Sequence, residues 1–177
     1  YILTINDDSK YEKSLVTSLY EVAISNNKYI VGSVQVEDGN ESKIWAIGTS
    51  IDFSQQRLMR LNFAGDDISI LSKLKNPYPV EFNPGNGVLI PRSVFETIGL
   101  YDEVNFPQYH ADSEFLLRAS RHADYKIVVS LKSIIVNHIL TEPLVNNFPD
   151  LLYSNKSDLN WRALATLLLR YYPNYEL

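Results

Sequence analysis

Residues 1–37, YILTINDDSKYEKSLVTSLYEVAISNNKYIVGSVQVE, decide the fold class. The run YILTI at residues 1–5 is short, apolar and partly β-branched, which predicts a buried strand, and the NDDS after it is a turn sequence. Residues 11–26 have the apolar spacing of an amphipathic helix, and residues 28–37 are typical of a second strand. A strand, a helix and a strand in this order predict an α/β fold with a mixed β-sheet flanked by helices.

The predicted helix has four apolar residues on one face: Leu15, Leu19, Val22 and Ala23. We expect Asp8 or Ser9 to cap its N-terminus, because short polar side chains accept hydrogen bonds from the first amides of a helix. After the turn sequence EDGNES, residues 43–53 predict a further strand. Residues 54–78 are polar and mixed, so we assign them no fixed structure.

The second half of the chain continues with strands and helices. A Gly-rich turn at residues 84–87 precedes an apolar strand at residues 88–90, and a helix begins near Ser93 and ends at Gly99. The remaining predicted elements are a helix at 112–122, strands at 126–130 and 133–136, and an amphipathic helix near the end of the chain with Asp158 as its cap.

Composition narrows the classes of function. The chain has 177 residues and 45% hydrophobic content, which suits one compact domain. Its formal charge of -5 is spread along the chain without a Lys/Arg block, so we predict no nucleic-acid partner. It has no Cys, which excludes disulfides, cysteine zinc sites and thiol nucleophiles. No apolar run approaches the length of a membrane span, so we expect a cytoplasmic protein, with peripheral contact at the inner face of the membrane as an alternative.

Two adjacent carboxylates, Asp7 and Asp8, follow the first predicted strand. Carboxylate oxygens suit Mg²⁺ or Mn²⁺, and a magnesium ion usually takes one or two carboxylates and completes its shell with substrate phosphates and water. The same pair is also typical of a capped turn at the start of a helix. The residues alone leave both interpretations open.

Two residues of the second half also have two interpretations each. Asp112 can cap a helix in which Glu114 and Arg118 pair one turn apart, or it can accept a proton from an attacking hydroxyl. His138 follows a buried strand, where a structural histidine bonded to backbone is common, although imidazole is also a ligand for Mn²⁺.

Three segments occur in an order that is more specific for a protein family than any one of them alone. NDDS at residues 6–9, GVLIPRSVFETIGLYDE at 87–103 and HADSEFLLRA at 110–119, followed by a strand ending in VNH, resemble the later half of GT-A glycosyltransferases. The similarity is to the large inverting group called family 2, which includes bacterial rhamnosyltransferase-like enzymes, and it covers residues 1–138.

This resemblance implies a GT-A fold and an activity. The implied enzyme is an inverting, metal-dependent glycosyltransferase that moves a sugar from a nucleotide-diphospho-sugar to a hydroxyl of a glycan or lipid-linked acceptor. Such an enzyme would serve polysaccharide biosynthesis for the cell envelope. The rival interpretation is a non-catalytic module that binds a carbohydrate or a partner protein.

The resemblance also implies a metal site. Asp7 and Asp8 match the aspartate motif that binds the divalent cation, Mn²⁺ or Mg²⁺, with Asp8 as the direct ligand. His138 matches a histidine that completes this site in many members. Asn6 stands where many members have an acidic residue, which leaves the metal site credible.

The substrate and the catalytic base have matching residues as well. Gly85, Asn86 and Gly87 match the loop beside the donor sugar and the acceptor, where small residues let backbone approach a ligand closely. Asp112 matches the catalytic base, although Ala111 replaces the Glu that usually precedes it. That departure removes an acceptor contact and leaves the substrate open.

The resemblance divides the chain into two parts. The family carries its nucleotide base and ribose on an N-terminal β-α-β half, and this chain begins in the strand that follows it. We therefore expect residues 1–142 to be the C-terminal portion of a catalytic domain, with weak or no transferase activity alone. We expect residues 143–177 to form a helical tail that covers the core or lies on a membrane surface.

Overall fold

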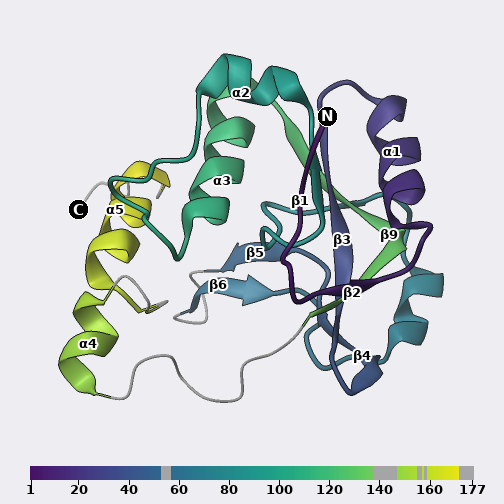
Figure 1. Cartoon of the computed structure of the whole chain (residues 1–177), viewed down its shortest axis with the longest axis horizontal. Helices are drawn as coiled ribbons and strands as arrows, with labels where there is room; N and C mark the ends of the chain where they lie inside the picture. The colour runs from purple at the N-terminus through teal and green to yellow at the C-terminus, as the bar shows by residue number, and fades with distance from the viewer. Residues whose placement is uncertain (53–56, 138–146, 155–156, 158, 172–177) are drawn as a thin grey trace.

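The computed structural model describes residues 1–52, 57–137, 147–154, 157 and 159–171. Among these residues, seven strands form one mixed sheet and two more form a separate hairpin, with helices on both faces of the sheet (Figure 1). The α/β fold class predicted from the sequence, a mixed sheet flanked by helices, is therefore confirmed.

The described elements follow one another along the chain as β1 (Ile2–Thr4), β2 (Lys10–Tyr11), α1 (Leu15–Ser25), β3 (Tyr29–Glu37), β4 (Asn40–Ala46), β5 (Thr49–Asp52), β6 (Arg57–Leu61), the 3-10 helix η1 (Ile68–Lys73), β7 (Tyr78–Pro79), β8 (Val88–Ile90), α2 (Arg92–Ile98), α3 (Ala111–Ala123), β9 (Lys126–Asn137), α4 (Phe148–Tyr153) and α5 (Trp161–Tyr171). None of the described helices is long and apolar enough to cross a membrane.

The centre of the sheet is the parallel pair of β3 and β9. On the other side of β3 lies β8, which runs antiparallel to both β3 and β1, so β1, β3 and β9 point in the same direction. The register pairs Thr4 with Val88 and Glu37 with Asn137. The carboxyl ends of the three parallel strands and the start of β8 therefore meet at one edge, where α/β sheets usually bind ligands.

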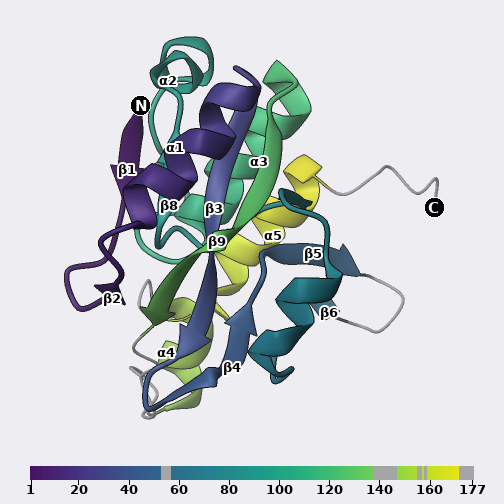
Figure 2. The same cartoon turned by 90° about the vertical axis from the view of Figure 1, so that its right-hand side faces the viewer.

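One face of this sheet is covered by α1, and the opposite face by α2, α3 and α5 (Figures 1 and 2). The four apolar residues that predicted the first helix are all buried against β3, β8 and β9, as predicted: Leu15, Leu19, Val22 and Ala23. On the opposite face, Phe115 of α3 and Leu167 of α5 share one core cluster with Ile30 and Ile127 of the central strands. The predicted tail helix therefore packs on the core.

The start of α1 differs from the prediction. Its N-cap is Ser14, so the predicted cap at Asp8 or Ser9 is wrong. The physical reason is that Lys10 and Tyr11 pair with β9 as the short strand β2, which draws the chain to the sheet before the helix begins.

Three other segments also differ. The strand predicted at 43–53 is divided into β4 and β5, because the chain turns at Gly48, which has a φ of 65°. Part of the segment without predicted structure forms β6 and η1, and Asp67 caps η1 by accepting a hydrogen bond from the Ser69 amide at 2.9 Å. The two strands predicted near the end of the sheet are one strand, β9, with a bulge after Ser130.

The described part of the tail contains one helix more than predicted. Helix α4 was not expected, and Asn147 caps it by accepting a hydrogen bond from the Asp150 amide at 2.9 Å. At the start of α5, the Asn160 side chain accepts a hydrogen bond from the Arg162 amide at 3.0 Å. Asp158, the cap predicted for this helix, lies outside the described residues.

Candidate functional site

The acidic pair lies in a turn directly after β1. Asp7 and Asp8 are both exposed there. The side chain of Asn86 holds this turn from both ends, since it accepts a hydrogen bond from the Asn6 amide at 3.0 Å and donates one to Ser9 Oγ at 2.8 Å. The structure therefore joins the predicted metal-binding turn to the predicted substrate loop.

The Gly-rich loop before β8 is tied to the end of β1. Thr4 Oγ1 donates a hydrogen bond to the Gly85 carbonyl at 2.7 Å, and the Gly87 amide donates to the Thr4 carbonyl at 2.9 Å. Gly87 has a φ of 72°, and a Cβ at this position would lie 2.7 Å from Ser33 Oγ. Only glycine fits this position without strain.

Asp112 lies in the first turn of α3 and faces the same loop. Its Oδ2 accepts a hydrogen bond from the Gly85 amide at 2.6 Å, and its Oδ1 accepts one from the Ser113 amide at 2.8 Å. The Ser113 hydroxyl also donates to Oδ1, at 3.5 Å, whereas Oδ2 keeps a second lone pair with which it can accept a proton or a hydrogen bond. Burial, and then the negative charge of Asp112, raise the pKa of the nearby Tyr101 phenol, which keeps Tyr101 a neutral hydrogen-bond donor.

The end of β9 also reaches this network. Asn137 Oδ1 accepts a hydrogen bond from Asn86 Nδ2 at 3.2 Å. His138, the next residue and a predicted metal ligand, lies outside the described residues, so its role stays a prediction.

These elements surround a pocket of about 580 Å³. Of the predicted residues that the structure describes, Gly85, Asn86 and Asp112 line it, whereas Gly87 and the acidic pair do not. Asp7 and Asp8 adjoin the pocket through Asn6. The lining comprises Asn6, Gln35, Trp45, Pro84, Gly85, Asn86, Tyr101, Gln108, Tyr109, His110, Ala111, Asp112 and Asn137.

Gln35 of β3 is a pocket residue that the sequence analysis missed. It is only 1% exposed, and its Nε2 donates a hydrogen bond to the Asn86 carbonyl at 3.1 Å. Its Oε1 has no hydrogen-bond partner among the described residues, so it is a buried acceptor at the pocket wall. A polar residue within the apolar run IVGSVQV was the signal that could have identified it.

The donor set of the acidic turn fits a hard divalent cation. Within the part of the chain that the structure describes, no three His, Cys, Asp or Glu side chains gather into a metal-binding group. Mg²⁺ and Mn²⁺ need only one or two carboxylates when ligand phosphates and water fill the other positions, and Asp7 and Asp8 offer two exposed carboxylates beside the pocket.

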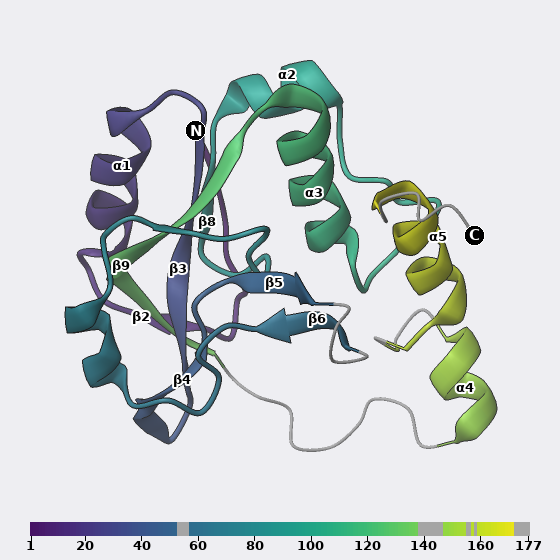
Figure 3. The same ribbon diagram turned by 180° about the vertical axis from the view of Figure 1, so that it is seen from behind.

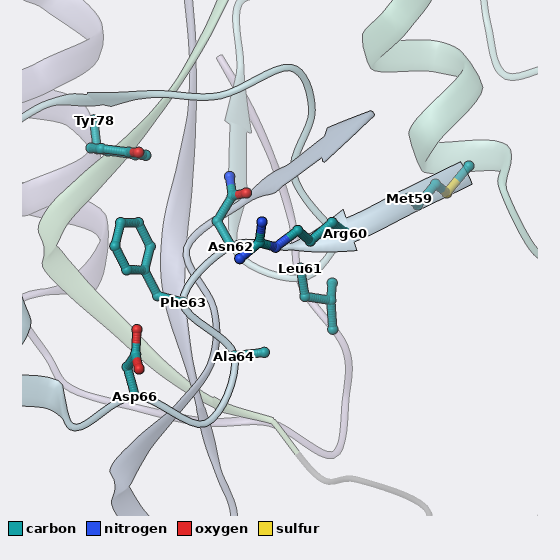
Figure 4. Close-up of a pocket in the computed structure, with 8 residues that line it drawn as sticks. All are labelled: Met59, Arg60, Leu61, Asn62, Phe63, Ala64, Asp66 and Tyr78. Carbon is teal, nitrogen blue, oxygen red and sulfur yellow. The ribbon is translucent and has the colours of Figure 1, made fainter. Parts of the chain in front are cut away.

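A larger hollow of about 720 Å³ lies over β6 and the loop after it (Figure 4). The rings of Phe63 and Tyr78 face each other edge to face there at 5.6 Å. The hollow is lined by Met59, Arg60, Leu61, Asn62, Phe63, Ala64, Asp66 and Tyr78. None of the residues predicted to carry chemistry lines it, so the pocket around Asp112 is the stronger candidate site.

No protein-family model matches this chain, and no curated protein matches it.

Proposed function

We propose that the protein is part of an inverting, metal-dependent glycosyltransferase of GT-A type. This enzyme transfers a sugar from a nucleotide-diphospho-sugar to a hydroxyl of a glycan or lipid-linked acceptor. The observation that supports this most is the hydrogen-bonded arrangement at the edge of the sheet. Asn86 holds the turn that carries the acidic pair, and the amide of the adjacent Gly85 donates a hydrogen bond to Asp112 in the wall of the pocket. Three motifs that are far apart in the sequence thus meet at one pocket.

In the proposed reaction, Asp112 acts as the general base. It takes the proton of the acceptor hydroxyl as that oxygen forms a bond to the anomeric carbon. The bond from this carbon to the diphosphate oxygen breaks, and the configuration inverts. The hydrogen bonds from Gly85 and Ser113 hold the carboxylate in one orientation and leave a lone pair of Oδ2 for the proton.

The acidic turn has the second role. Asp7 and Asp8 would hold the divalent cation, which neutralises the charge that develops on the departing diphosphate. Asn86 keeps the turn beside the pocket, because it bonds to residues on both sides of the acidic pair. The general base and the cation site are thus separate groups, and the loop that contains Gly85 and Asn86 holds both of them in place.

The test is turnover of nucleotide-sugars by the full-length gene product, followed as release of nucleoside diphosphate with and without Mn²⁺. Asp112→Asn keeps the size of the side chain and removes its basicity, so we expect the rate to fall by about 10²–10⁴-fold. Asp124→Asn is the matched control, because Asp124 lies exposed at the other end of α3. That control should retain the wild-type rate.

Two results would contradict the proposal. The first is an Asp112→Asn protein with an unchanged rate, which would show that Asp112 is not the general base. The second result is a protein that binds glycans, shows no metal-dependent turnover, and binds them equally well after Asp112→Asn. This result favours the non-catalytic carbohydrate-binding module instead.

A further inference from the structure

A second hollow adjoins the candidate site on the side of the helical tail. It has a volume of about 360 Å³ and lies between residues 104–109 and the helices α4 and α5, of which α4 lies next to α5 and away from α3 (Figure 3). Tyr109 lines both this hollow and the pocket around Asp112. The hollow, called the tail hollow below, is lined by Val104, Asn105, Pro107, Tyr109, Tyr153, Ser157, Asn160, Arg162, Ala163 and Thr166.

The lining of the tail hollow combines aromatic rings with polar groups. Tyr153 of α4 lines the hollow and is 61% exposed. Its ring meets the ring of Trp161 edge to face at 6.4 Å; Trp161 is 48% exposed and lies next to this lining rather than in it. The guanidinium of Arg162 lies 5.8 Å from the centre of the Trp161 ring. Asn105 and Thr166 add amide and hydroxyl groups to the wall. Exposed rings beside hydrogen-bonding groups suit a ligand with one apolar face and a polar rim.

A pyranose ring has this chemistry. Its axial C–H bonds form an apolar face that can cover an aromatic ring, and its hydroxyls both donate and accept hydrogen bonds at the edge. The volume of the tail hollow is close to the lower end of the range for small-molecule sites, which suits one or two sugar residues.

The far wall of the tail hollow is fixed relative to α3. Arg170 of α5 bonds to Asp102 Oδ2 at 2.7 Å, and the Tyr171 hydroxyl donates to Glu114 Oε1 at 2.7 Å. Glu114 is two residues from Asp112 on α3. These contacts hold the tail hollow in place beside the pocket around Asp112. Because its wall is already ordered, ligand binding in the tail hollow costs less entropy.

We propose that the tail hollow binds a sugar residue of the acceptor glycan, next to the residue whose hydroxyl enters the pocket around Asp112. The proposal rests on the glycosyltransferase function proposed above and adds a preference for acceptors of more than one sugar. Tyr109 forms the boundary between the two subsites, because it lines both.

The two tryptophans of the chain allow each subsite to be followed separately. Trp45 lines the pocket around Asp112, and Trp161 packs on Tyr153 at the tail hollow. In the Trp45→Phe protein, emission reports on Trp161 alone, and in the Trp161→Phe protein it reports on Trp45 alone. The titrants are methyl hexosides and linear hexose tri- and tetrasaccharides, added to the 177-residue chain.

We expect tri- or tetrasaccharides to change the emission of Trp161, with at least tenfold weaker binding by the methyl hexosides. Adding Tyr153→Ala to the Trp45→Phe protein should weaken oligosaccharide binding by at least tenfold. Thr166→Phe, which fills the tail hollow, should do the same, so the test does not depend on one variant. Leu169→Ala is the control, since Leu169 is 88% exposed on α5 and does not line the tail hollow.

The outcomes separate this proposal from the function on which it rests. No Trp161 response to any oligosaccharide, or affinities unchanged in both Tyr153→Ala and Thr166→Phe, would overturn the subsite. A Trp161 response only to anionic phospholipid vesicles would overturn it too, and would assign this surface to a membrane. If Trp161 responds to oligosaccharides while the full-length gene product releases no nucleoside diphosphate, the tail hollow is an oligosaccharide-binding site and the transferase proposal is wrong.

Discussion

Tyr171→Phe tests how the tail helix is attached to the rest of the molecule. Glu114 is fully buried, and its Oε1 accepts hydrogen bonds from the Tyr171 hydroxyl at 2.7 Å and from Arg118 and Arg170 at 3.1 Å each. Burial, and then the hydrogen bond to Glu114, raise the pKa of Tyr171, so the hydroxyl stays a neutral donor. The substitution removes this donor and leaves the ring in place.

The expected loss follows from the chemistry of that bond. A hydrogen bond to a charged group stabilises a protein by about 1.5–3 kcal/mol, and no cavity adds to the cost because Phe retains the ring. We therefore expect the free energy of unfolding to fall by about 2 kcal/mol. For a domain of this size that corresponds to a decrease in Tm of roughly 4 to 8 °C.

The assay is urea unfolding followed by far-UV circular dichroism, with thermal unfolding as a second measurement. Tyr11→Phe is the matched control, because Tyr11 is 56% exposed on β2 and should change stability by less than about 0.5 kcal/mol. Glu114→Gln should also lower the free energy of unfolding, by about 1.5–3 kcal/mol, because it removes the charge from the buried acceptor that Tyr171, the partly exposed Arg118 and the exposed Arg170 share. A Tyr171→Phe protein as stable as Tyr11→Phe would refute the described attachment.

Three further predictions concern the site and the pH dependence. Gly87→Ala should lower the free energy of unfolding by about 1–3 kcal/mol in urea, because a side chain is strained at its φ of 72°; an unchanged midpoint would contradict this. Asn86→Ala should speed amide exchange in the turn that carries the acidic pair, since that turn loses two hydrogen bonds, and unaltered exchange there would show that the turn is held otherwise. Burial alone would raise the pKa of Asp102, but hydrogen bonds from Asn105 and Arg170 lower it from 3.8 to about 2. Its contribution to stability is therefore present above about pH 4 and is lost as the pH falls toward 2. Arg170→Met should reduce this dependence in stability measurements across that pH range, and an identical pH profile would exclude the ion pair as its source.

The sequence predicted the sheet and its main helices where the signal was local. Four apolar residues at helical spacing identified the buried face of α1, because a repeat of that kind has few other solutions in a folded chain. The start of α1 was not predictable in the same way. Its position depends on the pairing of Lys10 and Tyr11 with β9, a contact across more than a hundred residues that no local pattern records.

In the candidate site, too, the sequence predicted what local motifs carry and missed what depends on contacts between distant segments. Asp112, Gly85 and Asn86 were found through their motifs, and the structure brings them to one pocket. The side chain of Asn86 was expected only beside a substrate, yet it also joins the turn after β1 to the end of β9. Such a bridging role depends on the ends of β1 and β9 and the start of β8, which come together only in the folded sheet.

The shared carboxylate of Glu114 has a practical consequence for producing the protein. A chain that stopped at residue 142, the boundary drawn from the sequence, would lose Arg170 and Tyr171 and leave Glu114 buried beside Arg118 alone. It would also uncover the core surface that Leu167 fills. A shortened gene that omits the tail should therefore yield aggregates in bacterial expression, and the smallest well-behaved product must extend through Tyr171.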